Sequence, residues 1–143
     1  MAEATYSKPV PSPTQESKPF WDGLLAGKLV LQSCGSCGRI RHYPRPICPA
    51  CSSFEVRWVE ASGRGKVHSW TVTHHPFHPG FKGEVPFTLV TVDLTEGVRM
   101  QAPLRGADGR ALAIGMPVRL VVERPTPDLA LPAFVLDRAE DRP

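Results

Sequence analysis

The chain has 143 residues, of which 41% are hydrophobic and 22% are charged, and its formal net charge at pH 7 is +3. This length fits one ordinary domain or two very small ones, either of which can bury a packed core. The charge is too small for a nucleic-acid tail or a polybasic membrane anchor, and the longest apolar runs are strand-sized, so we expect a cytoplasmic protein without a signal peptide or membrane span. Sixteen prolines and twelve glycines favour short strands and turns over long helices.

The first third of the chain predicts an arm, a helix and a strand. Residues 1–18 are rich in Pro, Ser and Lys and poor in large apolar side chains, which predicts a flexible N-terminal arm. Apolar residues at helical spacing follow Pro19, and Gly27 keeps this predicted helix short. "KLVLQ" predicts a strand that leads into the cysteine segment.

Four cysteines, the only ones in the chain, occur as two Cys-x-x-Cys pairs. They are Cys34, Cys37, Cys48 and Cys51. Two such turns supply the four sulfur ligands of a tetrahedral zinc site, and because no coordination position is left for water, the predicted zinc is structural. Iron in a rubredoxin-like site and a redox or disulfide pair are the alternatives. A redox Cys-x-x-Cys normally comes as one pair beside a βαβ pattern, which is absent here.

The remainder of the chain, from Arg57 onward, alternates apolar and polar residues with period two. About five strands with short turns after a small metal module predict a closed or nearly closed barrel, since closure removes exposed sheet edges. We therefore expect a mainly β chain: a helix and zinc ribbon over residues 19–56, a barrel over 57–138, and a frayed end at 139–143.

Several other side chains could contact a ligand or a partner. The loop "HHPFHPGF" contains His74, His75, Phe77 and His78. Its prolines disfavour the helix that would align the histidines for a second metal site, so an exposed loop is expected, and its phenylalanines favour an interface.

A basic segment lies between the two cysteine pairs and contains Arg39, Arg41, His42 and Arg45. It forms either a solvated face or a surface that attracts phosphates or an acidic partner. Trp70 is expected in the barrel core or as an exposed stacking platform. Phe20 and Trp21 either pack the helix onto the barrel or anchor it against a partner.

No set of residues forms a recognisable catalytic motif. There is no Gly-x-Ser-x-Gly, no phosphate-binding loop and no cysteine beyond the predicted metal ligands. Asp93 and Glu96 are explained by a turn, and a pair between His74 and Asp93 is conceivable across strands. Catalysis by this chain alone is therefore not expected.

Three stretches together resemble the DUF35 family. They are the Phe20-Trp21 helix start with the four cysteines, the Ser-Gly-x-Gly turn at Ser62 to Gly65, and the Glu-Gly-x-Arg turn at Glu96 to Arg99. The resemblance covers roughly residues 19 to 137. It implies a rubredoxin-like zinc ribbon followed by a five-stranded OB-fold.

The resemblance also implies a function. Such proteins are usually non-catalytic partners of acyl-CoA enzymes: thiolase-like enzymes, lipid-transfer-protein-type aldolases or acyltransferases, and MaoC-like hydratases. Some help to hold the CoA thioester, and some act in steroid side-chain degradation. The rival interpretation is a module that binds single-stranded nucleic acid, for which the net charge is low; a third is an enzyme that uses the histidine-rich loop.

Overall fold

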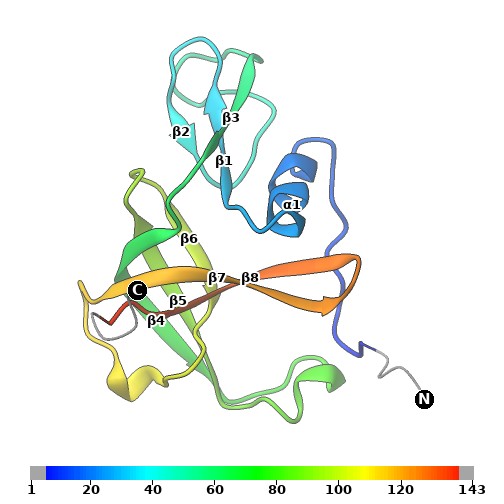
Figure 1. The fold of residues 1–143 in the computed structure, drawn as a ribbon, viewed down its shortest axis with the longest axis vertical. Coiled ribbons are helices and arrows are strands. Elements are labelled where there is room, and N and C mark those ends of the chain that lie inside the picture. Colours follow the sequence, from blue (N-terminus) through cyan, green and yellow to red (C-terminus); the bar gives the residue numbers. More distant parts are fainter. Residues whose placement is uncertain (1–5, 139–143) are drawn as a thin grey trace.

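The computed structural model describes residues 6–138. It contains a small ribbon sheet, a barrel and one α-helix between them (Figure 1). The mainly β fold with a zinc ribbon and a five-stranded OB-like barrel, as predicted, is confirmed. The predicted frayed end at 139–143 lies outside the described residues, as do the first five residues of the predicted arm.

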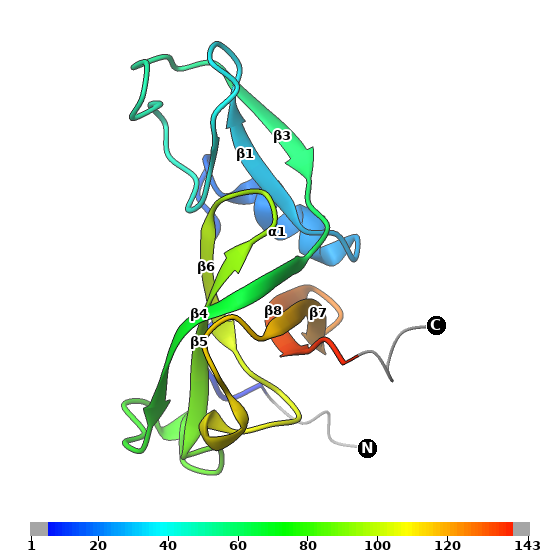
Figure 2. The same ribbon diagram turned by 90° about the vertical axis from the view of Figure 1, so that its left-hand side faces the viewer.

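Three antiparallel strands form the ribbon sheet, in which β1 (Val30–Cys34) lies between β2 (Ile40–Arg41) and β3 (Val56–Glu60). β3 pairs with β1 along the full length of both strands. The expected boundary at residue 57 therefore falls inside β3, so the first short strand expected in the barrel belongs to the ribbon sheet. Figure 2 shows β1 and β3 side by side above the barrel.

Five antiparallel strands form the barrel sheet in the order β6-β5-β4-β7-β8. Their bounds are β4 (Arg64–Thr73), β5 (Phe87–Leu94), β6 (Arg99–Pro103), β7 (Pro117–Thr126) and β8 (Leu129–Leu136). Two short 3-10 helices, η1 (Pro79–Phe81) and η2 (Gly109–Ala111), lie in the β4–β5 and β6–β7 connections. Alternate residues of β5 are buried, as the period-two pattern predicts.

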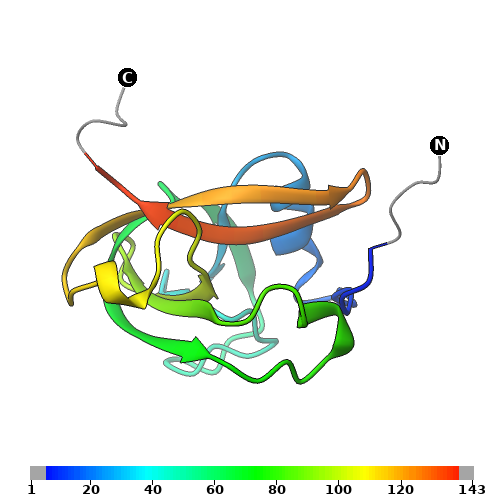
Figure 3. The same cartoon turned by 90° about the horizontal axis from the view of Figure 1, so that it is seen from below.

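The sheet closes where the end of β6 reaches β8. Leu104 and Phe134 form a parallel bridge, and the Arg105 N–H donates to the Phe134 carbonyl at 2.8 Å. The Arg105 guanidinium makes two hydrogen bonds to the Glu123 carboxylate, at 2.9 and 3.0 Å, and this pair raises the pKa of Arg105. These contacts cover both sheet edges at this point. Figure 3 shows the barrel from the end opposite the ribbon.

The two glycine-containing turns of the family pattern meet each other in the fold. Ser62 N–H donates to the Glu96 carboxylate at 3.2 Å, and Thr95 N–H donates to the Arg64 carbonyl at 3.0 Å. A side chain at Gly65 would place its Cβ only 2.5 Å from the Asp93 carbonyl oxygen. Glycine is therefore required at this position by the close approach of a neighbouring strand.

Helix α1 (Lys18–Leu25) connects the ribbon to the barrel. It begins with Pro19 in its first turn and ends in a Schellman motif, in which Gly27 has φ +77° and Lys28 N–H donates to the Gly23 carbonyl at 2.8 Å. Phe20 and Leu24 are buried in the barrel core beside β8. Within residues 6–138, no helix has the length and apolar character needed to cross a membrane.

Residues 6–17 precede α1 and contact the barrel. The Lys8 ammonium lies 2.7 Å from a Glu84 carboxylate oxygen and 5.3 Å from the centre of the Phe81 ring. Val10 lines a groove with Trp21 and Leu129. These contacts connect the segment both to the histidine-rich loop and to α1, while the flexibility of residues 1–18 stays a prediction.

Candidate metal centre and the surfaces around it

The four cysteines converge at the end of the ribbon that points away from the barrel. Each Cys-x-x-Cys pair lies in a tight turn. Gly38 N–H donates a hydrogen bond to the Cys34 carbonyl at 3.0 Å, and Ser52 N–H donates to the Cys48 carbonyl at 2.9 Å. All four Sγ atoms lie within 4.8 Å of one another. Among residues 6–138 this is the only group of three or more potential metal ligands brought together in this way.

The sulfur–sulfur distances fit a tetrahedral metal site. Cys34 Sγ and Cys51 Sγ are 3.5 Å apart, and Cys37 Sγ and Cys48 Sγ are 3.7 Å apart. Four sulfurs around zinc at ~2.3 Å would be separated by about 3.8 Å in a regular tetrahedron. A disulfide would need ~2.05 Å, so the four thiols are free. The donor set and its geometry support a structural zinc ion.

The surrounding backbone favours thiolates at this centre. The N–H groups of Cys37 and Ser36 each lie 3.4 Å from Cys34 Sγ and lower the pKa of the Cys34 thiol to about 6. The pKa of Cys51 is raised to about 11: the Ser53 N–H lowers it, but the neighbouring Cys34, burial and the other sulfurs together raise it more. Adjacent thiolates repel one another, and a bound divalent cation removes that repulsion.

The basic segment between the cysteine pairs divides into buried and exposed arginines. Arg41 is only 6% exposed; its Nε donates to Gln32 Oε1 at 2.5 Å and its Nη2 donates to the Arg45 carbonyl at 3.1 Å. The solvated face expected here is therefore wrong for Arg41, because Gln32 and the loop backbone hold its guanidinium inside the ribbon. Arg39 and Arg45 are exposed, and their side chains make no hydrogen bond or ion pair with the described residues.

The predicted aromatic contacts have different environments. Phe20 is 6% exposed and packs against Trp21 and His42, so it is a core residue and not a partner contact. Trp21 is half-buried at the edge of the groove lined by Val10. Trp70 is also half-buried; it packs against the core cluster and lines a cavity of about 550 Å³ with His74.

The histidine-rich loop is exposed, as predicted. Phe77, at 87% exposure, lies in an edge-to-face contact with His75. His78 Nδ1 accepts a hydrogen bond from Gly80 N–H at 3.0 Å and so begins η1. His74 is exposed on the β4 side of the loop. The described histidines do not converge on a metal position.

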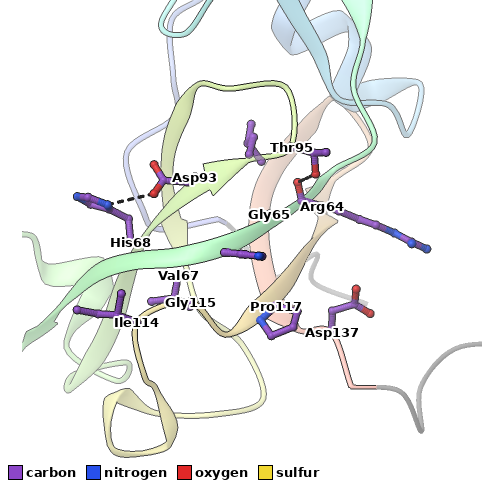
Figure 4. A pocket seen from close by; sticks show the side chains of 12 residues that line it. Arg64, Gly65, Val67, His68, Asp93, Thr95, Ile114, Gly115, Pro117 and Asp137 are labelled. Carbon is purple, nitrogen blue, oxygen red and sulfur yellow. Dashed lines mark hydrogen bonds and ion pairs between the residues drawn. The ribbon is translucent and has the colours of Figure 1, made fainter.

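A histidine–aspartate pair that the sequence analysis missed lies beside a cavity of about 650 Å³ (Figure 4). His68 Nδ1 is 3.1 Å from Asp93 Oδ2, and Arg99 Nε donates to Asp93 Oδ1 at 2.7 Å. Arg99 and then His68 hold the pKa of Asp93 below its usual value. The conceivable pair between His74 and Asp93 is therefore wrong, since Asp93 has these two partners instead.

A β-bulge in β4 places His68 toward Asp93. Val67 pairs with Val92 and Ser69 pairs with Thr91, so His68 is an extra residue without a partner on β5. The bulge leaves no pattern in the sequence, because it depends on the register between β4 and β5. The exposed side chains of both residues make this pair a surface feature with access to the cavity.

Comparison with known proteins identifies both parts of the chain. A model described as the ChsH2 rubredoxin-like zinc ribbon domain matches residues 21–57, and one described as the ChsH2 C-terminal OB-fold domain matches residues 58–123. The chain is 39% identical to a chain of a solved structure, the Ltp2-ChsH2(DUF35) aldolase. That match has a TM-score of 0.82 and covers 90% of this chain and 99% of the other.

Curated relatives include hydratase subunits and scaffold proteins. The probable enoyl-CoA hydratase alpha subunit of Thermomonospora curvata is 40% identical over 89% of this chain, and the 3-oxo-4,17-pregnadiene-20-carboxyl-CoA hydratase alpha subunit of Mycobacterium tuberculosis is 45% identical over 76%. The chain spans only 39% and 34% of their respective lengths. A DUF35 domain-containing scaffold protein of Pyrococcus furiosus is 35% identical over 68% of this chain and 70% of its own length.

Proposed function

The chain belongs to the DUF35 family, and from this membership we propose that it is a non-catalytic accessory subunit of an acyl-CoA-processing complex. Its partner is a thiolase-like enzyme, a lipid-transfer-protein-type aldolase or acyltransferase, or a MaoC-like hydratase. In this role the chain stabilises the partner and helps to form the site for the acyl-CoA thioester. The similarity to the Ltp2-ChsH2(DUF35) aldolase chain, which extends over 99% of that chain, is the observation that carries the proposal.

The acyl group in this proposal is a steroid side chain or another lipid-derived acid. The hydratase relative from Mycobacterium tuberculosis supports it, because the substrate in its name is a pregnadiene carboxyl-CoA. The histidine–aspartate pair and the half-buried Trp70 lie on open cavities of the barrel, where a long thioester could extend between the chain and its partner.

Exposed apolar side chains on the ribbon offer a docking surface for that partner. Ile47, Phe54 and Val56, here called the ribbon patch, are 44%, 72% and 38% exposed. Phe54 and Val56 line one groove together with the half-buried Trp58. Large exposed aromatic and aliphatic groups of this kind supply most of the affinity in many interfaces. The structural zinc would fix the two cysteine turns that flank the patch.

The proposal is tested by affinity capture with the tagged, zinc-loaded chain, followed by mass spectrometry of the retained proteins. We expect an acyl-CoA enzyme of one of the three classes at near-integral stoichiometry. Phe54→Asp should reduce capture strongly, because it places a charge in the ribbon patch. Val10→Asp, which alters an exposed apolar residue in the segment before α1, is the matched control and should not.

Two results would contradict the accessory role. One is turnover of acyl-CoA thioesters at an enzyme-like rate by the isolated chain. The other is capture of nucleic acid that is lost as salt rises, with no protein partner, which would favour the single-strand-binding module. Undiminished capture by Phe54→Asp would place the docking surface outside the ribbon patch.

A further inference from the structure

A cavity of about 570 Å³ lies at the junction between the ribbon and the barrel, and arginine side chains line it. Arg39, Arg41 and Arg45 come from the ribbon, and Arg99 comes from the start of β6 in the barrel. Asp93 is the one carboxylate among the lining residues. The volume falls in the range of sites that hold small molecules, roughly 300–1,000 Å³. We call this cavity the junction site.

Two nitrogen atoms of the junction site residues are buried without a hydrogen-bond partner. Arg41 is 94% buried, and although its Nε and Nη2 are bonded to Gln32 and to the Arg45 carbonyl, its Nη1 has no partner. The Nε2 atom of the adjacent His42 is also buried without a hydrogen-bond partner. Buried polar atoms in folded proteins are nearly always paired, so each exception calls for a ligand or water that completes it.

The remaining charges of the junction site are available to a ligand. Arg39 and Arg45 use only backbone atoms in their hydrogen bonds with the described residues: the Arg39 carbonyl accepts from Cys34 N–H, and Arg45 N–H donates to Gln32. The Asp93 carboxylate is already compensated, because one oxygen accepts from Arg99 Nε and the other lies against His68. The cavity therefore has a strong excess of uncompensated positive charge.

We propose that the junction site binds a phosphate group. A phosphate carries a charge of about −1.5 to −2 at neutral pH and several acceptor oxygens, which suit a cavity lined by several arginines better than a single carboxylate does. Arginine forks bind such oxygens in pairs. The phosphate is either that of a nucleotide-like ligand or free inorganic phosphate. Its assignment to the CoA moiety rests on the proposed function, whereas phosphate binding itself does not.

The test is an NMR titration of the zinc-loaded full chain with three probes: adenosine 3′,5′-bisphosphate, inorganic phosphate, and pantetheine, which has no phosphate. We expect the first probe to bind and to shift the backbone amides of Arg45, Gly97 and Arg99. Inorganic phosphate should bind at the same amides more weakly, and pantetheine should not bind there. Equal affinity for the first two probes would assign the site to free phosphate.

Two matched variants distinguish loss of phosphate binding through loss of charge from loss through misfolding. Arg39→Gln/Arg45→Gln removes two guanidinium groups that the fold does not use, and should raise the dissociation constant for the bisphosphate by about tenfold or more. Arg110→Gln removes an exposed arginine on η2, in a different cavity, and should leave it unchanged. Unchanged amide shifts in wild type, or equal affinity in all three proteins, would overturn the proposal.

The outcome also separates this proposal from the accessory role. Phosphate binding without capture of an acyl-CoA enzyme would support the junction site and contradict the proposed function. If the wild-type chain binds no phosphate but the double arginine variant fails to capture its enzyme partner, the site receives a carboxylate of the partner. That result would overturn phosphate binding and leave the accessory role intact.

Discussion

At the scale of single residues, the tightest constraint is the approach of two strands at Gly65. Gly65→Ala would bring a methyl group within 2.5 Å of both the Asp93 carbonyl oxygen and a methyl of Val92. Because strand backbone cannot move aside cheaply, we expect the free energy of unfolding to fall by about 1–3 kcal/mol or more. Chemical denaturation of the zinc-loaded protein measures this loss.

Gly83→Ala is the matched control, since an added Cβ at Gly83 has no heavy atom within 4 Å. We expect no loss of stability there. Equal stability of the two variants would show that β4 and β5 separate more easily at Gly65 than their register implies.

The partly buried His42 makes the stability of the fold depend on pH. Burial lowers the pKa of His42 to about 4, so the folded chain resists protonation that the unfolded chain accepts from about pH 6.5 downward. The contribution of His42 to the free energy of unfolding is therefore fully present above pH 6.5. It is lost as the pH decreases toward 4, by up to about 3 kcal/mol for a pKa shift of this size. Denaturation curves at successive pH values measure this slope.

His42→Phe keeps a ring between Phe20 and Tyr43 but removes the titrating group. Both proteins lose zinc affinity in acid, so the difference between their curves isolates His42. Parallel curves for the two proteins would show that His42 is protonated without cost in the folded chain.

Whether an individual side chain is buried or exposed was the feature that the sequence predicted least well. The four cysteine ligands follow from spacing alone, because a Cys-x-x-Cys turn brings its two sulfurs together locally. Arg41 looked like a surface charge, and only the tertiary pairing with Gln32, nine residues away, shows that it is buried. The sequence was equally consistent with Phe20 packing onto the barrel and with Phe20 contacting a partner, and only the position of α1 against the barrel decides between them.

At the scale of elements, the ribbon depends on its metal while the barrel has its own core. Removal of zinc with a chelator should unfold β1, β2 and β3, because the metal would bind the two cysteine turns to each other and its binding energy stabilises the folded ribbon. Amide NMR signals of the barrel strands should persist, and metal analysis should give one zinc per chain. Re-addition of zinc is the control, and retention of the ribbon signals without metal would contradict this expectation.

The positions of the strands in the sequence were predicted well, but the pairing of strands into sheets was predicted less well. Period-two alternation is clearest in β5 and β6, whose buried residues alternate with more exposed ones, whereas β8 is buried at adjacent positions. Alternation does not state which sheet a strand joins, and β3 accordingly belongs to the ribbon, where the free edge of β1 accepts it. The same limit concealed the bulge in β4, which is a property of pairing and not of one strand.

At the scale of the whole molecule, the segment before α1 connects distant parts of the fold. Lys8 and Glu84 form an ion pair in which the side chains are 20% and 34% exposed. A double-mutant cycle with Lys8→Ala and Glu84→Ala should give a coupling energy of about 0.5–1 kcal/mol, the upper range for pairs at a surface. The cycle for Lys18 and Asp22, which are both largely exposed, is the control and should give less. Zero coupling for Lys8 and Glu84 would show that this ion pair does not hold the segment against the barrel.

The bulge at His68 has a consequence for how this chain can change over evolutionary time. Val67, Ser69 and Trp70 oppose three consecutive residues of β5, so a strand lacking His68 would already alternate regularly between core and solvent. A single-codon deletion at this position would keep the packing of Val67 and Trp70 and remove the group that faces Asp93. Lineages could thus gain or lose this surface feature by one small insertion or deletion, without redesign of the barrel that carries it.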